Sequence, residues 1–392
     1  MSLDLKNEKG IRLPDQKFDW RDLVRLPISK LNDDAFTRVR VILMNGIESD
    51  ALRFKHICAR MNNGELRLDL ARIRRIEHFQ QTLVNWLLPP DQSPIETTIG
   101  YEQVAIEVTA SVAQHEPNPY LGQVYRFGLL EDFDHMYRYS ALLDRVEGKD
   151  ANNILQNYTD IRPGRPTREE HRAPEDDLRN HYDRTTAAPI TKLNAITLMA
   201  AEYQTHDYYM NIGPTFADPV ARQLYAEIAA IEEQHVTQYE SLSDPTESWL
   251  EKWLLHEATE CYNYLSCVTY ESNSRIKSIW ERFLDYELGH LHYVAELLKK
   301  YEGRDPAEII PDSLPEPIKF ASHREFVRET LKNEVDLRAS GTQFIPKEQE
   351  APDSLSVIQR NQLNSNGCPS DIVADGYQWR PGTELKSYPK VA

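Results

Sequence analysis

Three segments of the chain place a carboxylate three residues before a histidine. They are Glu232-x-x-His235, Glu287-x-x-His290 and Asp132-x-x-His135. In an α-helix, residues three apart lie on one face, so the carboxylate and the imidazole of each motif can reach a single metal ion. Carboxylate oxygens combined with an imidazole nitrogen suit iron or manganese. The spacing therefore predicts metal-binding helices.

A glutamate precedes each motif by 30 residues. These glutamates are Glu202, Glu257 and Glu102, which pair with Glu232, Glu287 and Asp132 in that order. The midpoints, near positions 217, 272 and 117, fall in runs rich in Pro, Asn, Asp and Ser. In an antiparallel helical hairpin, residues equidistant from the turn lie level, so each glutamate should face its motif. Apolar neighbours at helical spacing predict that these carboxylates are buried, and buried charges need a partner such as a divalent cation.

The elements that must position these groups are helices. Segments with apolar residues at the i, i+3, i+4, i+7 spacing of an amphipathic helix span residues 34–61, 66–88, 95–115, 119–146, 190–212, 219–242, 246–270 and 274–301. Turn signals separate them, and Asp244-Pro245-Thr246-Glu247 predicts a capped helix start with proline at the first helical position. No series of strands is predicted, so the fold class is all-α.

An internal repeat organises these helices. Residues 142–154 recur in modified form at 297–309, an offset of 155, and the same offset relates Glu102 to Glu257 and Asp132 to Glu287. We therefore expect tandem four-helix-bundle halves. The predicted parts are an N-terminal arm (1–33), a degenerate four-helix repeat (34–146), an irregular linker or crossover (147–187), a four-helix repeat with the complete ligand motif (188–303), and a C-terminal helix with an extended tail (304–392).

The motif resembles that of the ferritin-like superfamily of di-iron and di-manganese carboxylate proteins. In that superfamily two helices each give a glutamate and two others each give Glu-x-x-His. The matching residues are Glu202, Glu232, His235, Glu257, Glu287 and His290. The resemblance implies two Fe or Mn ions, alike or mixed, and oxidase, peroxidase, catalase-like or oxygenase chemistry. It also implies bridging roles for Glu232 and Glu287, terminal roles for Glu202 and Glu257, and one nitrogen ligand from each histidine.

The first half carries the motif in degraded form. Glu48, Glu77 and Glu102 are present, but Gln80 stands at the position equivalent to His235. Glu77 lies in an arginine-rich helix, which favours ion pairing over metal binding there.

Two pairings of the hairpins remain open. The second half alone would bring together the six residues named above, and the short link near 243–246 favours this simple up-down arrangement. The long 147–187 linker also allows the hairpin 95–146 to pair with the hairpin 246–301. That pairing would assemble Glu102, Asp132, His135, Glu257, Glu287 and His290. One complete site is expected.

Composition narrows the classes of function. The net charge of −17 argues against a general nucleic-acid binder, which needs a basic face. No apolar run is long enough for a transmembrane helix, and the first ten residues lack an apolar signal core, so we expect a cytoplasmic protein. The expected partners are metal ions, O2 or peroxide, and other copies of the chain in a homo-oligomer formed through helical faces or the tail. The favoured function is a dinuclear oxidoreductase, and the alternatives are iron handling such as ferroxidation, or a metal-free helical scaffold for assembly.

Overall fold

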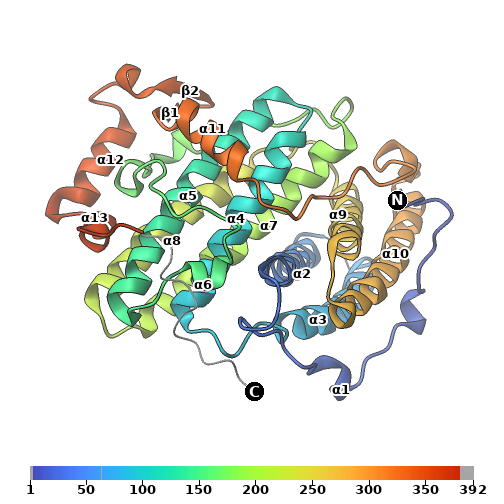
Figure 1. Ribbon diagram of the computed structural model, residues 1–392. Coiled ribbons are helices and arrows are strands. Elements are labelled where there is room, and N and C mark those ends of the chain that lie inside the picture. The colour runs from blue at the N-terminus through green and yellow to red at the C-terminus, as the bar shows by residue number, and fades with distance from the viewer. Residues whose placement is uncertain (1–2, 63, 380–392) are drawn as a thin grey trace.

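The chain folds mainly into helices, as the sequence predicts. In the computed structural model, which describes residues 3–62 and 64–379, long helices form four consecutive hairpins (Figure 1). They are α2 (Ala35–Met61) with α3 (Arg67–Asn85), α4 (Pro94–His115) with α5 (Pro119–Glu147), α7 (Pro189–Ile212) with α8 (Pro219–Glu240), and α9 (Trp249–Tyr270) with α10 (Ser274–Glu302). No helix in the described part of the chain is both long and apolar enough to cross a membrane.

Local sequence explains where these helices begin and end. The side chains of Asn118 and Asn273 cap α5 and α10 by accepting backbone N–H groups, and each helix ends at a glycine with positive φ, Gly148 at 62° and Gly303 at 66°. The start of α9 differs from the prediction. Ser248 is its N-cap, whereas Asp244 accepts from backbone N–H groups in the preceding turn.

The hairpins combine into two groups of four helices. One group contains α2, α3, α9 and α10, and the other contains α4, α5, α7 and α8, and the two groups meet where α2 packs against α7 (Figure 1). Each half of the repeat therefore gives one hairpin to each group. This arrangement corrects both predicted pairings. The short links 86–93 and 241–248 each connect a helix of one group to a helix of the other. A short link requires only that the two helices lie close together, and neighbouring helices can belong to different groups.

The segment 147–187 is also different from a simple linker. It contains α6 (Asn152–Leu155) and the 3-10 turns at Thr167–Glu169 and Pro174–Asp176, and part of it lies against α5. The N–H of Arg165 donates to Leu130 O (3.0 Å), just as the N–H of Ile11 in the N-terminal arm donates to Asp285 O of α10 (2.7 Å). The two donors are 154 residues apart, so the repeat also includes part of the N-terminal arm and part of the segment 147–187.

Glycine makes both of these backbone contacts possible. A Cβ atom on Gly164 would collide with Leu130 O, and a Cβ atom on Gly10 would collide with Asp285 O. Gly10 also has a φ of 60°, which favours glycine. The N-terminal arm can therefore lie directly on α10, which carries His290, and the segment 147–187 can lie directly on α5, which carries His135.

The described part of the C-terminal region folds against helices of the same chain, which corrects the prediction of an extended tail. It comprises α11 (Arg324–Glu334), a hairpin of β1 (Leu337–Ser340) and β2 (Gln343–Pro346), α12 (Leu355–Leu363) and α13 (Pro369–Ala374). The strands pair antiparallel, with Ala339 opposite Phe344, and α13 packs against α5 and α8. The last part of the predicted tail, residues 380–392, lies outside the described residues.

Smaller elements complete the described chain. They are α1 (Trp20–Leu23) and the 3-10 turns at Leu13–Asp15, Gly213–Thr215, Pro306–Glu308, Lys347–Gln349 and Asn364–Asn366.

Candidate metal centres

Six of the nine predicted site residues meet inside the group formed by α4, α5, α7 and α8. We call this cluster the two-histidine centre. It consists of Glu102, Asp132, His135, Glu202, Glu232 and His235. Ligand atoms of Asp132, Glu202, Glu232 and His235 lie within 4.8 Å of one another, and so do those of Glu102, His135 and Glu232. All six side chains are buried. Glu232 belongs to both sets, so the centre has two adjacent positions that could hold metal ions.

The two histidines turn the same ring nitrogen toward this centre. Nε2 of His235 lies 2.7 Å from Glu131 Oε2, and Nε2 of His135 lies 2.9 Å from Glu170 Oε2. A metal-binding imidazole is neutral and has one N–H group, which these carboxylates are placed to accept in both rings. The lone pair of Nδ1 then faces inward, which is the arrangement that a metal ligand requires.

Charged residues outside the centre support this orientation. Glu131 receives Arg165 (3.1 Å) and Arg172 (2.6 Å), both from the segment before α7. Burial raises the pKa of Glu131, but Arg172, His235 and Arg165 outweigh burial and hold that pKa well below its usual range. Glu131 is therefore an anion that accepts the His235 proton. Glu170 lies in the same segment, so the predicted linker supplies one of the groups that orient the centre.

The two-histidine centre has a large excess of negative charge. Nδ1 of His235 lies 3.2 Å from Glu232 Oε2 and 3.3 Å from Asp132 Oδ1. Burial lowers the pKa of the His235 ring, but Asp132, Glu131 and Glu202 raise it well above its usual value. Burial and neighbouring carboxylates also raise the pKa of Glu102 and Glu202. Bound protons can therefore neutralise part of the negative charge of this centre, as divalent cations also could.

Unpaired oxygens test whether the residues present fit a metal. Within the described chain, both carboxylate oxygens of Asp132, both of Glu202 and Oε2 of Glu102 are buried without a hydrogen-bond partner. Leaving such atoms unpaired costs about 1–3 kcal/mol each, and more when they are charged. The donor set of carboxylates and two inward nitrogens fits divalent transition metals.

The other three predicted residues meet in the second group of helices. We call this cluster the lysine centre. It consists of Glu48, Lys55, Glu77, Gln80, Glu257, Glu260, Glu287 and His290. Its ligand atoms form two sets within 4.8 Å, one of Glu77, Glu257, Glu287 and His290 and the other of Glu48, Glu260 and Glu287. Lys55 Nζ lies 2.5 Å from Glu77, 3.1 Å from Glu257 and 3.4 Å from Glu260. The predicted ion pair of Glu77 therefore exists, but its partner is Lys55 of α2.

Hydrogen bonds also occupy several side chains of the lysine centre that could otherwise bind metal. Gln80 Nε2 donates to Glu287 Oε1 (2.5 Å) and Glu48 Oε1 (3.3 Å), and the Tyr264 hydroxyl donates to Glu48. His290 Nε2 donates to Gln16 Oε1 of the N-terminal arm (2.7 Å). Burial lowers the pKa of Lys55, but Glu257, Glu260 and Glu77 raise it well above its usual value, so Lys55 is an ammonium ion.

Several of these groups were missed by the sequence analysis. Glu131, Glu170, Lys55 and Gln16 carry no metal-ligand motif. The repeat contains a signal for two of them, because Gln16 and Glu170 are 154 residues apart and occupy equivalent places beside a histidine. Glu260 is buried in the lysine centre, whereas Glu233, one position after Glu232, is exposed.

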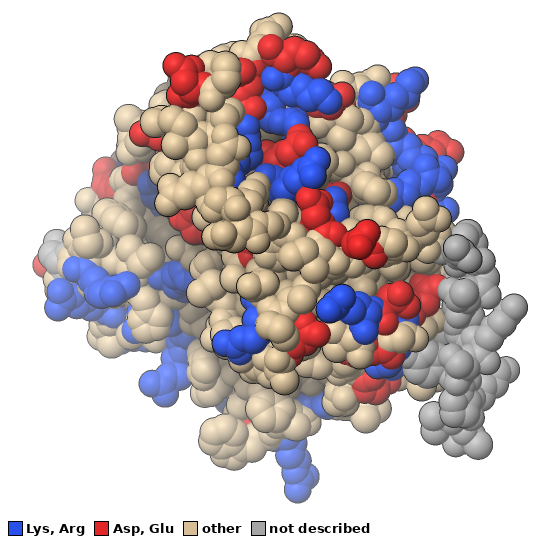
Figure 2. All heavy atoms as spheres, turned by 90° about the vertical axis from the view of Figure 1, so that its left-hand side faces the viewer, with Lys and Arg blue, Asp and Glu red and all other residues tan. Residues whose placement is uncertain are grey.

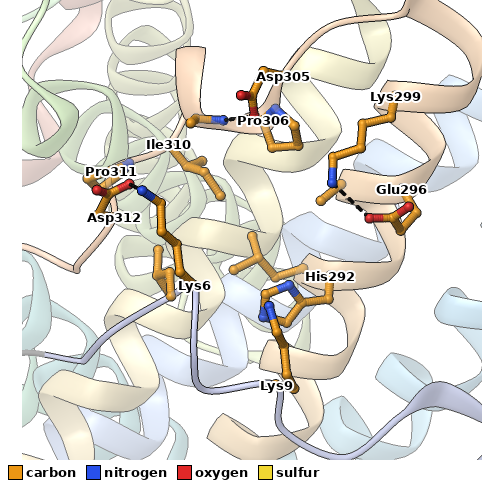
Figure 3. A pocket seen from close by; sticks show the side chains of 14 residues that line it. Lys6, Lys9, His292, Glu296, Lys299, Asp305, Pro306, Ile310, Pro311 and Asp312 are labelled. Atoms are coloured by element: carbon orange, nitrogen blue, oxygen red, sulfur yellow. Dashed lines mark hydrogen bonds and ion pairs between the residues drawn. The ribbon is translucent and has the colours of Figure 1, made fainter.

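None of the surface hollows described is lined by a carboxylate or histidine of either centre, although one is lined by Tyr209, which contacts Glu102. One on the outer side of α10 is lined by Lys6, Lys9, His292 and Lys299 (Figure 3). Its charges are paired in exposed ion pairs, Lys6 with Asp312 and Lys299 with Glu296. On the face that carries α12 and α13, basic and acidic side chains are interspersed rather than separated by sign (Figure 2). Neither feature brings unpaired donor atoms together as the interior does.

The chain was compared with protein-family models, with curated proteins and with solved structures, and no match was found in any of the three. The case for a function therefore rests on the geometry of the two centres.

Proposed function

We propose that this chain is a ferritin-like dinuclear metal protein whose two-histidine centre binds two Fe or Mn ions. One observation carries the proposal. Glu102 of α4 and Glu202 of α7 each give a carboxylate, while α5 and α8 give Asp132-x-x-His135 and Glu232-x-x-His235. This is the ligand pattern of di-iron and di-manganese carboxylate bundles, with aspartate in place of one glutamate.

The two sets of donors suggest how the ions would be shared. Glu102 and His135 would serve one ion, and Glu202 and His235 the other. Glu232 belongs to both sets and would contribute to both positions, which is the role that the resemblance implies for it. Asp132, which lies with the second set, takes the position that the sequence analysis gave to Glu287.

We further propose that the protein is an oxidoreductase acting on O2 or peroxide. Two redox-active ions held next to each other would supply the electrons for such a reaction. The protein holds the donors in place and keeps water away. The Tyr209 hydroxyl donates to Glu102, and the buried rings of Tyr139 and Tyr225 lie 5.1 and 5.6 Å from the Tyr209 ring. Glu131 and Glu170 hold the Nε2 protons of the two histidines and so keep both Nδ1 atoms free for metal.

The test is elemental analysis of protein purified without chelators, followed by O2 and H2O2 consumption assays. We expect about two Fe or Mn ions per chain, in accord with the ligand pattern, and consumption that depends on them. The Glu232→Ala variant should lose both the metal and the activity. A wild-type protein with no Fe or Mn, or one equally active after complete metal removal, would contradict the proposal.

A further inference from the structure

The lysine centre keeps three carboxylates that its ammonium does not neutralise. Lys55 Nζ bridges Glu77 and Glu257 and reaches Glu260 less closely, at 3.4 Å. Beyond this ion pair, oxygens of Glu48, Glu260 and Glu287 come within 4.8 Å of one another. They come from three different helices, α2, α9 and α10, so the packing of the whole group brings them together.

Unpaired atoms point into this part of the centre. In the described part of the chain, Glu48 Oε2, Glu260 Oε2 and Gln80 Oε1 have no hydrogen-bond partner. Their side chains are at most 1% exposed. A buried charge without a partner costs several kcal/mol. These unpaired oxygens are therefore available to a positively charged partner.

The charges of the lysine centre lead to the same conclusion. Five carboxylates, on Glu48, Glu77, Glu257, Glu260 and Glu287, surround one ammonium group. Gln80 is neutral and His290 already donates its Nε2 proton to Gln16. A divalent cation beside Lys55 could hold the carboxylates that this single ammonium does not bridge.

The donor atoms indicate which kind of cation fits. Relative to the two-histidine centre, this position has Gln80 where the other has His235, and Glu260 where the other has Ala105. It has lost a nitrogen donor and gained a carboxylate. Sites built only from carboxylate and carbonyl oxygens favour hard cations such as Mg²⁺ and Mn²⁺.

We propose that the lysine centre binds one hard divalent cation, Mg²⁺ or Mn²⁺, through Glu48, Glu260 and Glu287, while the Lys55 ammonium fills the neighbouring cation position. The protein would then combine a dinuclear centre with nitrogen ligands and a mononuclear centre with oxygen ligands. This inference concerns different helices from the proposed function and does not depend on it.

Calorimetric titration with Mn²⁺ alone, with bound metal counted after dialysis, tests the proposal. The Glu202→Ala/Glu232→Ala double variant disables the two-histidine centre and should still bind one equivalent of Mn²⁺, which Mg²⁺ displaces. Adding Glu260→Ala, which restores the alanine found at the equivalent position 105, should abolish this binding. Adding Glu233→Ala, on the exposed side of α8, should leave it unchanged. No Mn²⁺ on the double variant, or retention after Glu260→Ala, overturns the proposal.

One further variant guards against loss of folding, and a second tests the cation position that Lys55 occupies. Glu48→Gln keeps the shape of the side chain and removes one charged ligand, so its far-UV circular dichroism should match the parent while its Mn²⁺ affinity falls at least tenfold. Lys55→Met frees Glu77, Glu257 and His290, so the same centre should gain a second equivalent of Mn²⁺. A Glu48→Gln protein with unchanged affinity, or a folded Lys55→Met protein with no added Mn²⁺, counts against the proposal. The metal content of the unmodified two-histidine centre reports separately on the proposed function.

Discussion

The two centres of this molecule occupy equivalent positions in a repeated scaffold but balance their buried acid in different ways. Where the two-histidine centre has Tyr209, the lysine centre has Lys55, and the side chains donate to the equivalent carboxylates Glu102 and Glu257. The first centre offers nitrogen lone pairs and leaves carboxylate oxygens unpaired. The second brings its own cation. This exchange of Tyr209 for Lys55 between equivalent helices is one of the differences that place part of the counter-charge of the lysine centre in the chain itself.

The residues that hydrogen-bond the histidine Nε2 atoms also differ between the two centres. Glu170 Oε2 accepts a hydrogen bond from His135 Nε2, and Gln16 Oε1 accepts one from His290 Nε2. A carboxylate behind the imidazole makes the ring a stronger ligand than a neutral amide does. His290 would therefore be the weaker metal ligand, in agreement with the Lys55 ammonium in the same centre.

The largest expected difference between the centres concerns Glu232 and its equivalent in the repeat, Glu77. Glu232→Ala should remove nearly all bound Fe or Mn and all metal-dependent O2 or peroxide consumption, since both donor sets include this residue. The equivalent change, Glu77→Ala, should leave the Fe or Mn content of the two-histidine centre unchanged. Elemental analysis of the two variants side by side measures the contrast. Equal losses in both would show that the centres do not act separately.

Lys55→Met should strongly destabilise the protein when metal is absent. It removes the only ammonium that the described residues place among the carboxylates of the lysine centre, and breaking a buried ion pair costs about 3–5 kcal/mol. The matched Tyr209→Phe variant removes one neutral donor from the other centre and should cost about 1–3 kcal/mol. Urea unfolding in EDTA compares the two. A Lys55→Met protein as stable as Tyr209→Phe would refute the role given to the ammonium.

Metal removal should lower the free energy of unfolding through mass action. At a free metal concentration about 100 times the dissociation constant, a ligand that binds only the folded state adds about 2.7 kcal/mol. We therefore expect EDTA to lower the melting temperature of the wild type. The Glu202→Ala/Glu232→Ala variant should show a smaller decrease, caused by the lysine centre alone. A melting temperature insensitive to EDTA in metal-loaded wild type is the contrary result.

The smallest expected effect belongs to the group that orients His135. Glu170→Gln keeps the shape of the side chain but weakens the acceptor of the His135 proton, and such changes lower metal affinity by about 10–100-fold. The opposite change, Gln16→Glu, should leave the affinity of the two-histidine centre unaltered. Competition with a chelator gives both values. If Glu170→Gln binds Fe or Mn as tightly as wild type, then Glu170 does not act through the histidine.

The sequence predicted the parts of this molecule that depend on local contacts. Helix positions followed from apolar spacing. Glu202 meets Glu232 and Glu257 meets Glu287 as predicted, because the turn of a hairpin sets which residues lie level. The pairing of hairpins was wrong in both versions, because it depends on packing between distant helices such as α2 and α7. Lys55 was missed because a lysine on a helix is usually exposed, and only the assembled group shows that this one is buried.

The exchange of hairpins between the two groups has a consequence for folding. The partners of α2 and α3 are α9 and α10, which lie about two hundred residues later in the chain. During synthesis the N-terminal hairpin must wait with its acidic face uncovered until almost all the helices have been made. Contacts of such high sequence separation form slowly and leave intermediates open to aggregation. Neither half of the repeat can complete either centre alone, so the chain has two centres but a single folding unit.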